Sequence, residues 1–214
     1  MSAHYAMTRT ELDALRRISR QEPVPEHCEL CHTALAEEHP HLLQRSNRQI
    51  VCACEACAIL FSHRSSNRPF LRIPRDAYQL SCFVISDADW AAMRLPIDLA
   101  FFVASSEERR VIAYYLSPAG STESLLDLEA WNDMVRNNPL LDRLEPDVEA
   151  LLVNRTHGRA DYFIAPIDQC YKLTGLIRRH WRGFSGGDEV WREIERFFKQ
   201  LAARAEHEER VSHA

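Results

Sequence analysis

Two pairs of cysteines, each with the spacing C-x-x-C, are the residues of this sequence best suited to bind a metal ion. The first pair is Cys28 and Cys31, and the second is Cys54 and Cys57, with 22 residues between the pairs. A C-x-x-C segment can fold as a knuckle, a tight turn that directs two thiolates at one ion, and two facing knuckles complete a tetrahedral four-sulfur shell. The spacing therefore predicts a metal centre formed by all four cysteines.

The spacing leaves the identity of the ion open, because zinc and iron both accept four thiolates in a tetrahedron. Rubredoxins, which hold one iron in this way, pack several aromatic rings around it and commonly end each knuckle with glycine. Residues 28–61 contain a single Phe, Tyr or Trp residue, Phe61, and the two knuckles are followed by His32 and Ala58. These differences favour zinc as the cofactor, with iron as the alternative.

The remaining cysteines and the nearby histidines are expected to stay out of the ion's shell. Cys52 lies two residues before the second knuckle, a spacing poorly suited to share the ion, so we expect a small buried residue there. Cys82 and Cys170 lie on faces that the pattern predicts to be buried. At His32 we expect a positive φ, which histidine tolerates better than most residues. Four thiolates saturate a tetrahedral ion, so we assign these histidines to the surroundings of the centre or to the surface: His27, His32, His39, His41 and His63.

The segment between the two cysteine pairs has the pattern of a β-hairpin. Residues 41–44 and 49–53 form its arms, and Ser46-Asn47 lies in its turn. Two knuckles that flank a hairpin have the layout of a zinc ribbon. A module of about 40 residues buries too little surface to fold well alone, whereas a structural zinc contributes about 10–16 kcal/mol of apparent binding free energy. The role expected for the ion is therefore structural.

The rest of the chain predicts a mixed α+β domain, because its strands and helices do not alternate regularly. The expected strands are 81–85, 111–116, 149–154 and 161–165, the last two forming a hairpin with its turn at 157–159, and 118–122 is expected to be a loop. The expected helices are 128–137, one from the N-cap Asp168 to about Arg182, and one from a capping box of Ser185 and Asp188 to about Ala205. Their apolar faces are Cys170, Leu173, Ile177 and Trp181 in the second helix, and Val190, Ile194, Phe197 and Leu201 in the third.

The domain organisation follows from these elements. We divide the chain into an N-terminal helix (1–22), a zinc-ribbon-like four-cysteine module (23–63), an α+β domain that ends in two helices (72–205) and a frayed tail (206–214), with residues 64–69 as a linker.

Composition and charge exclude several classes of protein. Hydrophobic residues make up 46% and charged residues 27% of the chain, which excludes a disordered protein. The sequence contains no run of 18 apolar residues, the length needed to cross a membrane. The acidic Glu11 and Asp13 argue against a secretory signal at the N-terminus. We therefore expect a cytoplasmic protein. The net charge of -5 argues against nucleic acid as a partner. Residues 1–75 carry 10 basic and 8 acidic residues, which leaves a ribbon that binds nucleic acid as a third hypothesis.

No catalytic constellation stands out in the sequence. The loop Phe184–Asp188 precedes a helix and could hold an anion there, but it lacks the lysine and the full spacing of a phosphate-binding loop. A turn between two helices explains its glycines better. We find no Ser–His–Asp or Cys–His arrangement and no framed pair of carboxylates, so no catalytic or organic-cofactor site is predicted.

Several strings carry a resemblance that extends over nearly the whole chain beyond residue 22. They are Cys28–Cys31, Glu38–Leu42, Cys52–Cys57, Ile97–Phe102, Pro118–Ser124, Glu145–Leu152, Pro166–Tyr171 and His180–Gly187. The chain resembles an uncharacterised bacterial family, a domain of unknown function, whose genes lie beside those of high-affinity uptake nickel–iron hydrogenases. The resemblance implies an accessory, maturation or electron-transfer role near a hydrogenase. This implication rests on the position of the genes and not on the chemistry of particular residues.

Together these observations predict a non-enzymatic accessory protein with a structural zinc, whose partner is a hydrogenase subunit or another assembly factor. The alternative hypothesis is a rubredoxin-like iron protein that carries electrons for a hydrogenase.

Overall fold

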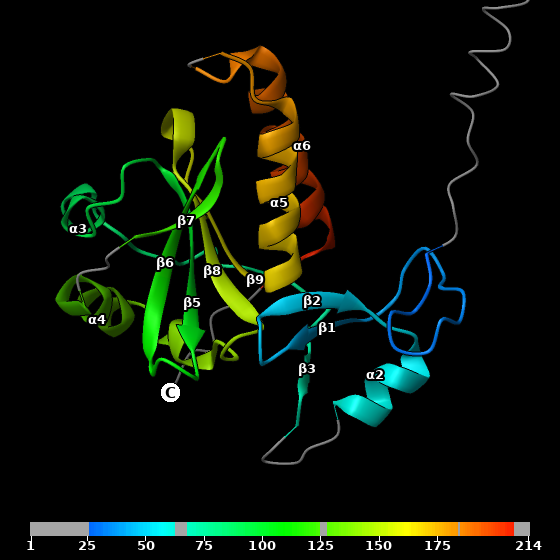
Figure 1. Cartoon of the computed structure of the whole chain (residues 1–214). Coiled ribbons are helices and arrows are strands. Elements are labelled where there is room, and N and C mark those ends of the chain that lie inside the picture. Colours follow the sequence, from blue (N-terminus) through cyan, green and yellow to red (C-terminus); the bar gives the residue numbers. More distant parts are fainter. Residues whose placement is uncertain (1–25, 63–67, 125–127, 184, 208–214) are drawn as a thin grey trace, which may run out of the picture.

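The computed structural model describes residues 26–62, 68–124, 128–183 and 185–207. They form a three-stranded sheet, a seven-stranded sheet and five helices, so the predicted α+β class is confirmed (Figure 1). The expected N-terminal helix, residues 64–67 of the linker and residues 208–214 of the tail lie outside the described residues. Within the described part of the chain, no helix is both long and apolar enough to cross a membrane.

The small sheet contains the predicted hairpin. Strands β1 (His41–Gln44) and β2 (Gln49–Cys52) pair antiparallel, with Ser46-Asn47 in the turn as expected. A third strand, β3 (Phe70–Arg72), pairs with the other side of β1, and helix α2 (Glu55–Phe61) follows the hairpin directly. The three residues of β3 are too few to show a periodic pattern, so the sequence did not reveal this strand.

The large sheet has the strand order β10-β4-β9-β8-β5-β6-β7. Its neighbours are antiparallel except for the parallel pair β10 and β4. The strands are β4 (Tyr78–Gln79), β5 (Leu99–Ser105), β6 (Arg110–Ser117), β7 (Gly120–Ser124), β8 (Glu149–Asn154), β9 (Asp161–Pro166) and β10 (Glu206–His207). The hairpin of β8 and β9 and the strand at 111–116 agree with the sequence, and Glu206–His207, assigned there to the tail, add an edge strand.

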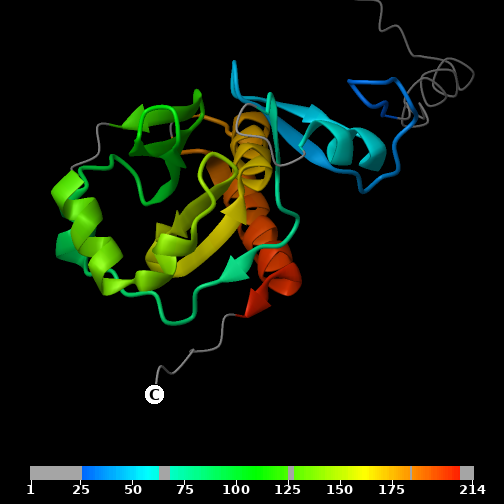
Figure 2. The ribbon, with the colours of Figure 1, turned by 90° about the horizontal axis from the view of Figure 1, so that it is seen from below.

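Helices cover both faces of the large sheet (Figures 1 and 2). Helices α5 (Ile167–His180) and α6 (Gly187–Arg204) pack on one face, and α3 (Asp87–Ala92) and α4 (Leu128–Asn137) on the other. Strand β5 alternates accordingly, since Phe101 packs with α5 and Phe102 packs with Trp131 of α4. A sheet buried on both faces explains the almost continuous apolar runs of β5 and β8. Short 3-10 helices occupy Pro139–Arg143 and Thr156–Gly158.

Three local predictions in this domain are wrong. Residues 81–85 form no strand, because the Asn138 side chain accepts a hydrogen bond from the Val84 N–H (2.7 Å) and donates one to the Val84 carbonyl (2.7 Å). These are the backbone groups that a neighbouring strand would otherwise pair. Cys82 is exposed in this segment rather than buried. The expected loop at 118–122 is only a turn, and Gly120–Ser124 continues as β7 beside β6.

The expected helix caps also differ. Helix α5 begins after Pro166, and the Asp168 carboxylate accepts a hydrogen bond from His41 instead of capping the helix. Helix α6 follows Gly186, which has a left-handed conformation, and neither Ser185 nor Asp188 caps it. The predicted apolar faces are buried at Cys170, Leu173 and Ile177 of α5 and at all four positions of α6, whereas Trp181 lies beyond the end of α5 and is half-buried.

A side chain at position 186 should destabilise the protein for two reasons, the backbone conformation of Gly186 and the lack of space around it. Its φ is +87°, and a Cβ atom would lie 2.8 Å from Val190 Cγ1 and 3.2 Å from the Trp181 ring. Gly186→Ala is expected to lower the free energy of unfolding by about 1–3 kcal/mol, measured by urea denaturation. Gly158→Ala is the control, since its φ is +73° but nothing lies within 4 Å. Equal losses from both substitutions would show that the contact with Val190 and Trp181 is unimportant.

The two faces of the small sheet pack against different partners. Leu43, Leu71 and Ile73 join the core that α5 and α6 form with the large sheet. Leu42 and Val51, which are register partners on the opposite face, pack with Cys28 and Cys57. The small sheet therefore lies between the main core and the cysteine cluster, and its hairpin fixes where the cluster sits.

Candidate metal centre

The first cysteine pair lies in a tight turn that backbone hydrogen bonds hold. The Cys28 N–H donates to the Thr33 carbonyl (2.8 Å), and the His32 N–H donates to the Cys28 carbonyl (2.8 Å). His32 has a φ of 61°, so the expected positive φ at this position is confirmed. This tight turn allows the thiol groups of Cys28 and Cys31 to point toward one common position.

The second cysteine pair uses the start of helix α2. Cys54 is the N-cap, and its Sγ accepts a hydrogen bond from the Cys57 N–H at 3.4 Å. The two pairs are joined through Glu29, whose N–H donates to the Cys52 carbonyl (2.9 Å) and whose carboxylate accepts from the Cys52 N–H (2.7 Å). Because the β1–β2 hairpin reverses the chain direction, it brings Glu29 and Cys52, which are 23 residues apart in the sequence, into contact.

The four sulfur atoms of Cys28, Cys31, Cys54 and Cys57 all lie within 4.8 Å of one another, and those of Cys31 and Cys54 are 3.7 Å apart. A tetrahedron with zinc–sulfur distances of about 2.3 Å has sulfur–sulfur edges of about 3.8 Å. The separation of Cys31 and Cys54 matches that value, and the 4.8 Å limit on the other pairs exceeds it by about 1 Å. The cluster could therefore hold a metal ion.

The cluster has a buried side and an open side. Cys28 is fully buried and Cys57 is 7% exposed, and both pack with Ala53 and Ala58 in a small apolar core. Cys31 is exposed and Cys54 is half-buried. An ion in this position would close the small core below it and keep one edge near solvent.

The surroundings shift the pKa values of the thiols in opposite directions. A hydrogen bond with the Thr33 hydroxyl, 3.3 Å away, lowers the pKa of Cys31 to about 6. Burial acts to raise the pKa of Cys28, but hydrogen bonds from backbone N–H groups outweigh it and the pKa is lowered. Burial and the neighbouring thiols raise the pKa of Cys57 to about 12. A metal ion binds thiolates only and must displace the remaining protons, so its affinity should fall as the pH falls.

A second group of possible ligands lies beside this cluster, and the sequence did not indicate a metal site there. Ring nitrogens of His39 and His41 and the sulfur of Cys52 lie within 4.8 Å of one another. Cys52 is half-buried rather than buried. The H-x-H spacing of His39 and His41 could have indicated this group, because alternate residues of an extended segment lie on the same face.

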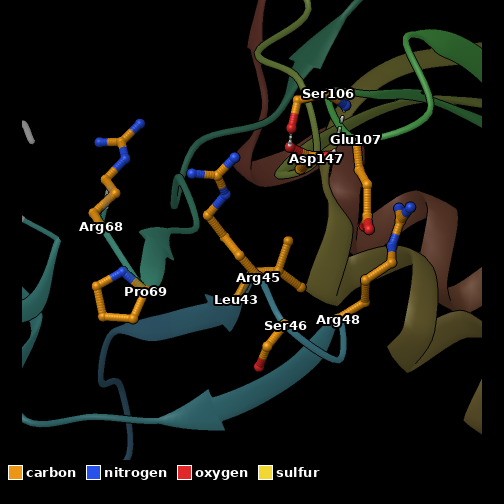
Figure 3. Close-up of a pocket in the computed structure, with 9 residues that line it drawn as sticks. All are labelled: Leu43, Arg45, Ser46, Arg48, Arg68, Pro69, Ser106, Glu107 and Asp147. Atoms are coloured by element: carbon orange, nitrogen blue, oxygen red, sulfur yellow. Dashed lines mark hydrogen bonds between the residues drawn. The ribbon is translucent and has the colours of Figure 1, made fainter. Parts of the chain in front are cut away.

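A groove separates the β1–β2 turn from the large sheet (Figure 3). Its volume is about 570 Å³, and its lining includes Arg45, Arg48 and Arg68. Among the described residues, none of these three guanidinium groups pairs with a carboxylate; Arg48 contacts the Ser105 hydroxyl at 3.5 Å, and Arg68 the Ser62 carbonyl at 3.5 Å. Asp147 also lines the groove, but the backbone and hydroxyl of Ser106 bind its carboxylate. Glu107 lines the groove as well, so three arginines face two carboxylates and the lining has a small excess of positive charge.

Comparison with known proteins identifies the family of the chain. No curated protein and no solved structure matches it. A family model described as a family of unknown function, DUF5947, matches residues 27–205. That range includes the four clustered cysteines, the small sheet, and both helices that follow β9. The chain therefore belongs to DUF5947, a family whose function is unknown.

Proposed function

We propose that this chain is a non-enzymatic, cytoplasmic accessory protein in which Cys28, Cys31, Cys54 and Cys57 hold one structural zinc ion. The observation that carries the proposal is the convergence of four sulfur atoms within 4.8 Å. A four-thiolate shell leaves no position open for substrate, which is typical of structural zinc sites. In this proposal the knuckles, the β1–β2 hairpin and the ion form a zinc-ribbon-like module.

A structural role fits the small size of the core around the cysteines. The buried residues of that core are few and mostly small, namely Cys28, Leu42, Val51, Ala53, Cys57 and Ala58. Such a core contributes little to folding by burial of apolar surface. Metal binding would supply the missing stability, as it does in small zinc domains.

Elemental analysis and a visible spectrum of the anaerobically purified protein test the identity of the ion. We expect zinc and no colour. A reversible ferric-thiolate absorption with stoichiometric iron would contradict the zinc proposal and support the rubredoxin-like electron carrier. The exposed edge at Cys31 is the observation that favours this second candidate, because electron transfer requires a centre close to the surface.

We further propose that the protein acts through contacts with a hydrogenase subunit or an assembly factor. The resemblance of the sequence strings to a family encoded beside hydrogenase genes supports this setting. The arginine-rich groove supplies a contact surface, since none of its three arginines forms an ion pair with a carboxylate among the described residues, although Glu107 and Asp147 also line it. Charge complementarity favours an acidic segment of the partner.

Reversal of charge in the groove should weaken this contact. We expect the double substitution Arg45→Glu and Arg68→Glu to reduce capture of the partner at least about tenfold, because like charges across an interface cost several kcal/mol. The measurement is a pull-down from the native host with quantitative mass spectrometry of hydrogenase subunits and assembly factors. Arg192→Glu, an exposed arginine of α6, is the control and should leave capture unchanged. Equal capture by the double variant and the control would remove the groove from the proposal.

A further inference from the structure

The group formed by His39, His41 and Cys52 has the geometry of a second ligand set. His41 is the first residue of β1, and Cys52, the last residue of β2, is its register partner. His39 precedes β1 by two residues, and its ring meets that of His41 edge to face with centroids 5.0 Å apart. Ring nitrogens of both histidines and Cys52 Sγ lie within 4.8 Å of one another.

The hydrogen bond of His41 leaves Nε2 as its free ligand atom. Its Nδ1 lies 2.6 Å from Asp168 Oδ2, at the start of α5. An ionised carboxylate only accepts, so Nδ1 is the donor in this contact, and in the neutral imidazole Nε2 then presents a lone pair. Metal-binding histidines almost always donate their other ring N–H to a carboxylate or carbonyl in this way.

His39 is oriented in the same manner by the backbone. Its Nδ1 lies 3.0 Å from the Ala36 carbonyl, which can only accept, so Nδ1 again carries the proton. The side chain is 7% exposed, and its buried Nε2 has no hydrogen-bond partner among the described residues. Oε2 of the exposed Glu26 lies 3.5 Å from Nε2. A buried nitrogen without a partner is unfavourable unless something binds it.

We propose that His39 Nε2, His41 Nε2 and Cys52 Sγ bind a second divalent transition-metal ion of the zinc class, separate from the four-cysteine centre. Two imidazoles and one thiolate suit zinc and related ions, whereas magnesium and calcium prefer oxygen ligands. Three protein ligands leave the fourth position of a tetrahedron to water or to an exchangeable ligand, unlike the closed four-thiolate shell. Asp168 is a positioning residue, because it fixes the tautomer and the ring orientation of His41.

The number of zinc ions bound per chain tests the proposal. After equilibrium dialysis of the reduced full-length protein against zinc, we expect two ions in the unsubstituted protein and one in the double variant His39→Gln and His41→Gln. His27→Gln replaces an exposed histidine of the same segment and should retain two. If the four-cysteine proposal fails and this one holds, the counts become one in the unsubstituted protein and none in the double histidine variant.

A cobalt titration identifies the ligands of the second ion. With zinc in the four-cysteine centre, added cobalt should give a thiolate-to-cobalt charge-transfer band that Cys52→Ser abolishes. Asp168→Asn should weaken cobalt binding about 10- to 100-fold, with an unchanged melting temperature in the absence of cobalt. The proposal is overturned if the unsubstituted protein binds only the ion of the four-cysteine centre, or if the second ion persists in the double histidine variant.

Discussion

Cys54→Ser is expected to release the ion of the four-cysteine centre and to open residues 26–62 to proteases. A serine hydroxyl is a poor metal ligand in place of a thiolate. Loss of a residue that only hydrogen-bonds to a ligand lowers metal affinity about 10- to 100-fold, and loss of a ligand itself should lower it further. Without the ion, few buried side chains hold the segment together. Zinc content and limited proteolysis, with the cleavage sites mapped by mass spectrometry, measure both effects.

Cys82→Ser is the control for this prediction, because Cys82 is exposed and lies outside both ligand groups. It should retain all bound zinc and the protease resistance of the unsubstituted protein. Cys52→Ser should also leave the four-cysteine ion and the resistance of residues 26–62 intact. If Cys54→Ser retains full metal content, or if Cys82→Ser causes the same loss, the assignment of the four ligands is wrong.

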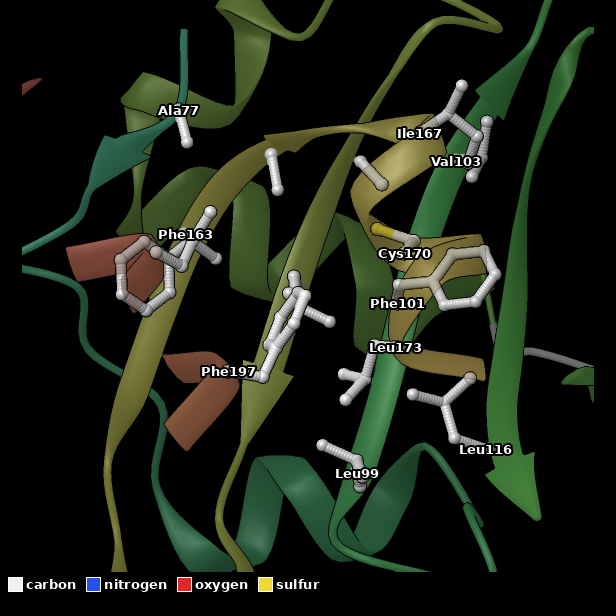
Figure 4. Packing of buried hydrophobic residues seen from close by; sticks show 14 of the residues in the cluster. Ala77, Leu99, Phe101, Val103, Leu116, Phe163, Ile167, Cys170, Leu173 and Phe197 are labelled. Carbon is white, nitrogen blue, oxygen red and sulfur yellow. The ribbon is translucent and has the colours of Figure 1, made fainter. Parts of the chain in front are cut away.

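Phe101→Ala is expected to lower the free energy of unfolding by about 3–5 kcal/mol, because it leaves a cavity in the main core. Phe101 is fully buried on β5, where it lies beside Cys170 and Leu173 of α5 (Figure 4). Its ring stacks on Tyr114 with centroids 5.0 Å apart and meets Tyr171 of α5 edge to face. Urea denaturation followed by tryptophan fluorescence measures the loss.

Val84→Ala provides the control, since Val84 is 64% exposed. Its effect should stay within about 0.5 kcal/mol. Both variants should bind as much zinc as the unsubstituted protein under conditions in which they are folded, because neither residue contacts the cysteine cluster. A loss of less than about 1 kcal/mol for Phe101→Ala would contradict the position of this ring in the core.

Local patterns with a strong physical cause could be predicted from the sequence. The period of α4 and α6, the hairpin of β8 and β9 and the hairpin between the cysteine pairs follow from apolar spacing and turn residues. The C-x-x-C spacing likewise predicted that the four cysteines lie close together. Their role as metal ligands remains a prediction, as does the structural role of the ion.

The features that the sequence did not reveal depend on contacts between distant segments. Asp168 has the position of a helix cap, but His41, 127 residues away in the chain, takes its carboxylate. Asn138 satisfies the backbone of Val84 across 54 residues and removes the need for a strand there. Cys52 was set aside on spacing alone, and only the register of β1 and β2 places it opposite His41.

The central claim is that four thiolates hold one zinc ion, and X-ray absorption at the zinc edge tests it most directly. The double variant His39→Gln and His41→Gln is the suitable sample, because it keeps Cys28, Cys31, Cys54 and Cys57 and lacks the second set of ligands. We predict one zinc per chain with four sulfur neighbours at about 2.3 Å. Fewer than three sulfur neighbours, or no stoichiometric metal in the folded protein, would contradict the account.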